Sequence, residues 1–187
     1  RLLRHCEGTG RPTHREWLAQ AAERLTAYRA PTWIGERHRQ LARRLEALPR
    51  TPESYGLIHC DFEADNVFYH PGSGRYAVID FDDMLHGWYA LDVVRALDSL
   101  TDLPQGDAPM SLALRQQAFL RGYRSCHPFT REQEASLPLM RQAVCLCEYA
   151  GLLHVLDEPV ANEPEWMRAL RRRLTHRLGE LERALQP

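Results

Sequence analysis

The chain opens with hydrophobic residues that recur at helical spacing. In the first such pattern these residues are Trp17, Leu18, Ala21, Leu25 and Tyr28. Thr13 and Glu16 form an S/T-x-x-E capping box in front of them, so the pattern predicts a helix over residues 13–29. A second helical pattern carries Ile34, Leu41, Leu45 and Leu48. It ends before Pro49, because proline disfavours helical backbone at the residue that precedes it.

The hydrophobic period changes after residue 54. Three short segments rich in β-forming residues follow, at residues 55–58, 67–69 and 76–79. Between the last two lies Pro71-Gly72-Ser73-Gly74, a strong turn sequence, which predicts a β-hairpin. The open ends of this hairpin carry Asn66 and Asp80. Because a hairpin brings its open ends together, we expect these two side chains to lie close to each other.

Helical patterns dominate the rest of the chain. They cover residues 90–100, 111–125, 132–156 and 164–185, and loops are predicted at 103–109 and 157–164. The whole pattern therefore predicts an α+β fold that is predominantly helical, with a small antiparallel hairpin. We predict a single lobe in three parts: an N-terminal helical hairpin (1–54), a loop with the β-hairpin (55–83) and a helical acceptor-binding region (84–187).

Composition narrows the classes of function. With 187 residues and 44% hydrophobic content, the chain can bury one good core. Its net charge of −1 argues against a nucleic-acid partner, because proteins that bind nucleic acids usually carry a strongly basic domain or stripe. No stretch approaches the roughly 20 apolar residues of a membrane span, so no membrane partner is expected. The five cysteines include no C-x-x-C pair, which disfavours disulfides and zinc and favours the reducing cytoplasm.

The strongest chemical signal is the sequence His59-x-Asp61-x-x-x-x-Asn66, followed after the turn by Asp80. Such a loop offers one carboxylate, from Asp61, to accept the proton of a substrate hydroxyl. The amide oxygen of Asn66 and the carboxylate of Asp80 are hard ligands of the kind that Mg²⁺ accepts. Together they predict phosphoryl transfer, in which a protein orients the nucleophile and neutralises phosphate charge.

These residues resemble the aminoglycoside phosphotransferase and choline-kinase-like enzymes, which are relatives of the protein kinases. The resemblance is close from residue 55 to about residue 100 and rests on His59-Cys60-Asp61 to Asn66, Val78-Ile79-Asp80-Phe81 and Leu91-Asp92-Val93-Val94. It implies the C-terminal lobe of a protein-kinase-like fold, with ATP or GTP as phosphoryl donor. By the same resemblance Asp61 is the catalytic base, and Asn66 and Asp80 hold Mg²⁺ and with it the nucleotide. His59, grouped with Asp61 in the catalytic loop, and Asp92 brace that loop.

Two departures from that family matter. Cys60 stands where glycine is most common, so we expect a local adjustment with retained chemistry. All 24 basic residues are arginine and no Gly-rich loop is present, so the usual cradle for nucleotide phosphates is missing. The chain also begins at Arg1 without a methionine. We therefore expect a fragment that is inactive without an N-terminal nucleotide-binding lobe of the same protein, and a small molecule with a hydroxyl group as the acceptor.

Several assignments stay open. Asp82 and Asp83 are either close to a second metal ion or solvated turn carboxylates, and we count Asp82 as a further candidate metal ligand. Acidic and aromatic residues that offer an acceptor pocket are His86, Trp88, Tyr89, Glu148, Tyr149, Asp157, Glu158, Glu163, Glu165 and Trp166. Two other functions compete with the kinase. One is a kinase-like module that binds a small molecule or a protein without catalysis, and the other is a phosphohydrolase that uses Asp80, Asp82 and Asp83.

Overall fold

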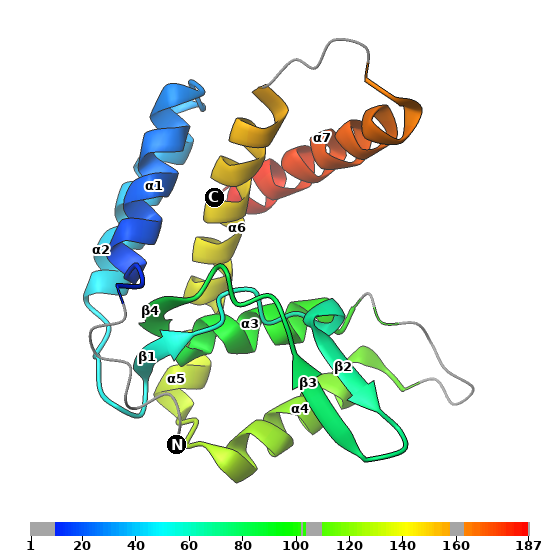
Figure 1. Cartoon of the computed structure of the whole chain (residues 1–187). Helices are drawn as coiled ribbons and strands as arrows, with labels where there is room; N and C mark the ends of the chain where they lie inside the picture. Colours follow the sequence, from blue (N-terminus) through cyan, green and yellow to red (C-terminus); the bar gives the residue numbers. More distant parts are fainter. Residues whose placement is uncertain (1–9, 102, 104–109, 158–162, 187) are drawn as a thin grey trace. The chain divides into compact units, whose positions relative to one another are not determined.

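The computed structural model describes residues 10–101, 103, 110–157 and 163–186. Its helices and strands form two compact units (Figure 1). The first unit contains Pro49–Met140 with the segment that ends at Thr13, and the second contains His14–Leu48 with the chain from Arg141 onward. The fold is predominantly helical with two small antiparallel sheets, which confirms the predicted fold class. Within these described ranges, no helix combines the length and the apolar character that crossing a bilayer requires.

The second unit is built from helices. α1 (His14–Ala27) and α2 (Thr32–Glu46) confirm the two helices predicted at the start of the chain, and α7 (Glu165–Leu185) confirms the last one. Its core contains the buried side chains Leu18, Leu25, Ile34, Leu41, Leu45, Leu181 and Leu185. His38 is buried among them and donates from Nε2 to the carbonyl oxygen of Leu18 at 2.9 Å. Burial lowers the pKa of His38, so this imidazole is held in its neutral form.

The first unit contains both sheets. β2 (Val67–His70) and β3 (Arg75–Val78) form the predicted hairpin, with Val67 opposite Val78 and His70 opposite Arg75. β1 (Tyr55–Ile58) confirms the remaining predicted strand. It pairs antiparallel with β4 (Leu85–Trp88), which the hydrophobic pattern did not predict. The reason is that β4 has four residues including a glycine, and such a segment carries little β-forming signal of its own.

β4 is a strand because of its neighbours. At Gly87 a Cβ atom would lie 2.9 Å from the side-chain ends of Ile58 on β1 and Leu85 on β4, so a larger residue there would make these side chains shift. The backbone N–H of His86 donates to the carbonyl oxygen of Pro12 at 2.8 Å, which adds a bond on the other edge of β4. Directly after β4 the chain enters α3 (Tyr89–Ser99), so the strand fixes where α3 begins.

The helices between α2 and α7 follow the prediction with one exception. α3 and α4 (Leu112–Cys126) agree with the predicted helices within one residue at each end. The predicted helix over residues 132–156 is wrong in that the structure divides it into α5 (Arg131–Ala135) and α6 (Leu137–Asp157). A capping box of Thr130 and Gln133 starts α5, which ends at Ser136. Pro138 lacks an N–H group and therefore suits the first turn of a new helix better than the interior of a continuous one.

Candidate active site

The candidate loop connects the two sheets of the first unit. It leaves β1 at Ile58 and ends in a short 3-10 turn (Ala64–Asn66) that runs directly into β2. Ile58, His59 and Cys60 are buried, whereas Asp61 is half-buried. Asp61 is therefore the first residue after β1 whose side chain reaches solvent.

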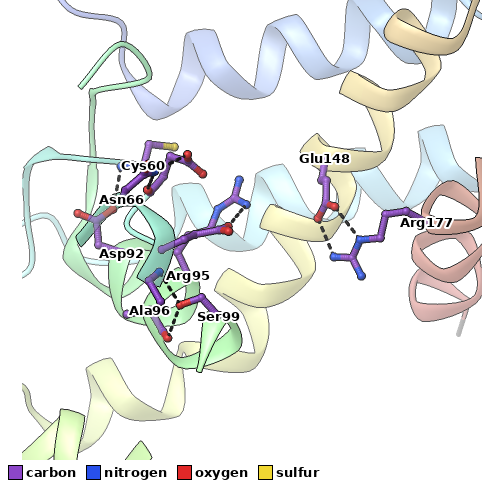
Figure 2. A network of polar contacts seen from close by, with 11 residues as sticks. Cys60, Asn66, Asp92, Arg95, Ala96, Ser99, Glu148 and Arg177 are labelled. Carbon is purple, nitrogen blue, oxygen red and sulfur yellow. Dashed lines mark hydrogen bonds and ion pairs between the residues drawn. The ribbon is translucent and has the colours of Figure 1, made fainter. Parts of the chain in front are cut away.

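Asp92, on the first turn of α3, holds the start of this loop. Its Oδ2 accepts the backbone N–H of His59 at 2.9 Å, and its Oδ1 accepts the backbone N–H of Cys60 at 2.8 Å (Figure 2). Burial raises the pKa of the Asp92 carboxyl, and the two backbone donors oppose that rise because they favour the ionised form. The contact agrees with the bracing role that the sequence predicts for Asp92.

His59 joins the loop to the end of β3. Its Nε2 lies 2.9 Å from the carbonyl oxygen of Ile79 and donates to it. Its ring packs against Phe62 and Phe81, with ring centroids 5.8 Å and 4.8 Å away. Within the described ranges, its buried Nδ1 has no hydrogen-bond partner. These contacts suit a histidine that positions the loop.

Cys60 has an unusual backbone conformation. Its φ is +68°, in the left-handed region that favours glycine, which accounts for glycine being most common at this position of the family. Its side chain is 6% exposed, and burial raises the pKa of the thiol to about 12. Arg95 opposes this rise in pKa, and the nearby carboxylates of Asp92, Asp83 and Asp61 contribute to it. The thiol therefore stays neutral and brings no charge to the site.

The backbone of Cys60 leads to a stability prediction. Cys60→Gly should be about 1 kcal/mol more stable to unfolding than Cys60→Ala, because alanine keeps the cost of a positive φ and glycine does not. Urea unfolding of both variants measures the difference. Cys126, at the end of α4, is the matched control, since there the alanine variant should be the more stable one by up to about 1 kcal/mol. Equal stability of the two variants at position 60 would contradict the role of φ.

Asn66 is oriented by Asp61. Its amide nitrogen donates to the backbone carbonyl of Asp61 and to Oδ2 of the Asp61 carboxylate, both at 2.9 Å. Asn66 is only 9% exposed, so these bonds are shielded from water. Because the nitrogen faces Asp61, the amide oxygen of Asn66 remains as the acceptor for a further partner. This is the atom that a metal ion would need.

Asp80 lies at the same end of the hairpin as Asn66. The backbone N–H of Ile79 donates to the carbonyl oxygen of Asn66 at 3.1 Å, which extends the ladder between β2 and β3 by one step. Asp80 follows at once, with a φ of +62° and an exposed side chain. Two hard oxygen donors, an amide and a carboxylate, are thus brought to one end of the hairpin. This donor set fits Mg²⁺, which usually takes one or two carboxylates and keeps several waters.

Asp82 and Asp83 are exposed. In the part of the chain that the structure describes, no three His, Cys, Asp or Glu side chains gather where they could hold a metal ion. Asp80, Asp82 and Asp83 therefore do not form the carboxylate centre that the phosphohydrolase hypothesis requires. The role of Asp82 as a ligand beside Asn66 and Asp80 stays a prediction.

The candidate acceptor residues differ in their environments. Trp88 and Tyr149 are buried, and the indole N–H of Trp88 donates to the carbonyl oxygen of Pro49. Three of the acidic candidates, Glu148, Glu163 and Glu165, form ion pairs with Arg177, Arg171 and Arg172 respectively. Arg177 meets both oxygens of Glu148, at 2.7 Å and 3.0 Å (Figure 2). Trp166 is 64% exposed, and Glu158 lies outside the described residues.

Sequence reasoning missed three residues at the site. Glu63 on the loop pairs with Arg95 on α3, and the hydroxyl of Ser99 accepts the backbone N–H of Ala64. The signal that was available is the spacing of Asp92, Arg95 and Ser99, which places three polar side chains on one face of a helix whose other positions are mostly apolar.

Comparisons with known proteins show the family of the chain. The family model described as the phosphotransferase enzyme family matches residues 4–129. A homoserine kinase from Caulobacter sp. (strain K31) is 27% identical over 165 residues, which cover 76% of this chain and 50% of that protein. A homoserine kinase from Methylobacterium nodulans is 33% identical over 117 residues, which cover 63% and 35%. The chain thus spans half or less of the length of these curated relatives.

A solved structure shows the same fold. It is an amicoumacin kinase in complex with AMP-PNP, Ca²⁺ and Ami, and it matches with a TM-score of 0.62 at 23% sequence identity. The match covers 83% of this chain and 46% of that one. At this identity the likeness concerns the fold, which is kinase-like.

Proposed function

Because the chain belongs to the phosphotransferase enzyme family, we propose that it supplies the catalytic base and the metal ligands of an enzyme that phosphorylates a small molecule. The reaction transfers the γ-phosphate of ATP or GTP to a hydroxyl group of that molecule. The observation that carries this proposal is the pair of 2.9 Å bonds between the Asn66 amide and Asp61. They orient the solvent-accessible carboxylate of Asp61 and leave the amide oxygen of Asn66 available to a cation.

Asp61 is the proposed base. Its Oδ2 accepts from Asn66, so Oδ1 is the oxygen that takes the proton of the acceptor hydroxyl. The hydroxyl oxygen forms a bond to the γ-phosphorus, the bond from that phosphorus to the bridging oxygen breaks, and the nucleoside diphosphate leaves. Asp92 and His59 contribute by holding the backbone next to Asp61 and next to Asp80. Asp92 accepts the N–H of Cys60, and His59 donates to the carbonyl oxygen of Ile79.

Asn66 and Asp80 are the proposed ligands of Mg²⁺. When it is bound, this ion supplies neutralisation of the phosphate charge. Both residues lie at the end of the hairpin opposite its turn. The backbone hydrogen bond between Ile79 and Asn66 holds the two strands together at that end. The positive φ of Asp80 is a conformation that costs energy, and such residues cluster at functional sites.

We further propose that an N-terminal lobe outside these residues completes nucleotide binding. The support is that the chain contains no lysine and no Gly-rich loop to hold the nucleotide phosphates. These residues alone are then expected to be inactive with ATP or GTP. Since both nucleotides are cytoplasmic metabolites, we place the enzyme in the cytoplasm.

A hydroxy amino acid such as homoserine is the proposed acceptor. The curated relatives are named homoserine kinases.

The metal ligands provide the test. In the complete polypeptide that contains this chain, Asp80→Asn should raise the Mg²⁺ concentration for half-maximal turnover at least about 10-fold, because it removes a charged ligand. The assay follows nucleoside diphosphate release from ATP or GTP with L-homoserine, choline or an aminoglycoside as acceptor. Asp82→Asn, assayed in parallel, tests the additional ligand role of Asp82.

The exposed Asp65, on the 3-10 turn, is the matched control, and Asp65→Asn should behave as the unaltered protein does. An Asp80→Asn variant with unchanged metal dependence would contradict the assignment of Asp80 as a ligand of Mg²⁺. If no acceptor is phosphorylated, while a small molecule binds regardless of Asp61 and Asp80, the non-catalytic module becomes the better account.

A further inference from the structure

We propose that Arg95 and Ser99 of α3 are positioning residues that hold the metal-binding half of the catalytic loop, through Glu63 and Ala64. The proposal rests on the proposed function, because it assigns to these residues the placement of Asn66 relative to Asp61. Asp92 holds the first half of the loop. With these three residues, one face of α3 contacts and holds the loop at three separate points.

The spacing along α3 makes this possible. Asp92, Arg95 and Ser99 are three and four residues apart, so their side chains lie on the same face of the helix. The buried side chains of the helix are Ala90, Leu91, Val93, Val94, Ala96 and Leu97. Because apolar packing fixes the helix, its polar face is a rigid support. Figure 2 shows the three polar side chains directed toward the loop.

Arg95 grips the loop at Glu63. Its Nη1 lies 3.0 Å from Oε1 of Glu63, and the two side chains are only 20% and 34% exposed. The backbone of Glu63 lies between the base and the metal ligand. Its N–H donates to the carbonyl oxygen of Asp61 at 2.9 Å, and its carbonyl oxygen accepts the N–H of Asn66 at 3.1 Å. Holding the Glu63 side chain therefore fixes the turn that sets Asn66 against Asp61.

Ser99 grips the loop one residue later. Its Oγ accepts the backbone N–H of Ala64 at 3.1 Å and donates to the carbonyl oxygen of Ala96 at 3.0 Å (Figure 2). Ala64 is the first residue of the 3-10 turn that carries Asn66. The hydroxyl thus links the start of this turn to the backbone of α3. A residue without a hydroxyl would leave the N–H of Ala64 without this acceptor.

Amide hydrogen exchange of the complete polypeptide tests this grip without any need for catalysis. In Ser99→Ala the amide hydrogen of Ala64 should exchange about 3- to 10-fold faster than in the unaltered protein. In Arg95→Met the amide hydrogens of Glu63 and Asn66 should exchange faster by the same factor. The amides of His59 and Cys60, which Asp92 holds, should stay at their original rates in both variants. Unchanged exchange at residues 63–66 would overturn the proposal.

Kinetics of the same variants then separate positioning from general stability. Arg95→Met and Glu63→Gln should each raise the Mg²⁺ concentration for half-maximal turnover about 10-fold and lower kcat, with the acceptor KM unchanged. The double variant should be no worse than either single one, because both break one contact. Arg95→Lys and Ser99→Thr, which keep a cation and a hydroxyl, should recover part of the loss.

Arg124→Met is the matched control. It removes an arginine of α4 that pairs with Glu134 of α5 at 2.7 Å in the same unit, a contact that involves no loop residue, and it should leave metal dependence and loop exchange unchanged. If Arg95→Met lowers stability but alters neither the metal dependence nor the amide exchange of the loop, Arg95 has only a structural role and the proposal fails. If the unaltered polypeptide shows no turnover, the proposed function fails instead, and the exchange result still decides whether α3 holds the loop.

Discussion

Asp61→Asn should lower kcat about 100- to 10,000-fold in the complete polypeptide, the range that the loss of a general base produces. The asparagine side chain has the same shape and can still accept from the Asn66 amide at one oxygen, so the loop is expected to keep its conformation. What it loses is the ability to take a proton from the acceptor hydroxyl. Steady-state kinetics with saturating Mg²⁺ and nucleotide measure the effect, and urea unfolding checks that stability changes by less than about 1 kcal/mol.

Two comparisons make this result decisive. Asp65→Asn removes a carboxylate from the same loop at an exposed position and should leave kcat within about twofold. Asp61→Ala also removes the side-chain acceptor of the Asn66 amide, so it should lower kcat at least as far and raise the Mg²⁺ requirement too. An Asp61→Asn enzyme that turns over at the original rate would show that another group takes the proton.

Asp92→Ala should have the largest effect on stability, about 2 to 5 kcal/mol. The carboxylate accepts two backbone N–H groups, from His59 and Cys60, and each buried donor left without a partner costs about 1 to 3 kcal/mol. Both residues are buried, so water cannot easily replace the lost acceptor. Urea unfolding measures the stability, and kcat should fall as well because Asp61 is the next residue along the chain.

Asp92→Asn separates the acceptor role from the charge. The amide of the new asparagine retains one oxygen for one of the two N–H groups, while its NH₂ group faces the other N–H donor. The stability of the Asp92→Asn variant should therefore lie between those of the unaltered protein and Asp92→Ala. Asp65→Ala, at an exposed position, should change stability by no more than about 0.5 kcal/mol. A loss below about 1 kcal/mol in Asp92→Ala would mean that the loop is held chiefly by other contacts.

The helices could be predicted because their signal is local. In α1, Leu18, Ala21 and Leu25 recur at the helical period, and all three are buried in the structure. The hairpin could be predicted for a similar reason, since Pro71-Gly72-Ser73-Gly74 specifies a turn between two β-forming runs. β4 could not, because Leu85–Trp88 becomes a strand only through its pairing with β1 and its bond to Pro12.

The candidate site divides in the same way. Asp61, Asn66, Asp80 and Asp92 were predicted as site residues from the sequence, because their residue types and spacing are typical of phosphotransferases. The contacts of Glu63 and Ser99 were not predicted. Each of these side chains is an ordinary loop or helix residue until the other segment is placed against it.

The sequence by itself determined most of the local elements and the family, and it predicted which groups are chemically active. These depend on the periodicity of hydrophobic residues and on functional groups at short spacing along the chain. Only the tertiary structure decided how those groups are held. It brought α3 against the loop, so that Asp92, Arg95 and Ser99 meet residues 32 to 35 positions earlier in the chain. Such contacts depend on how buried apolar faces pack, and that packing is a property of the whole unit rather than of any one segment.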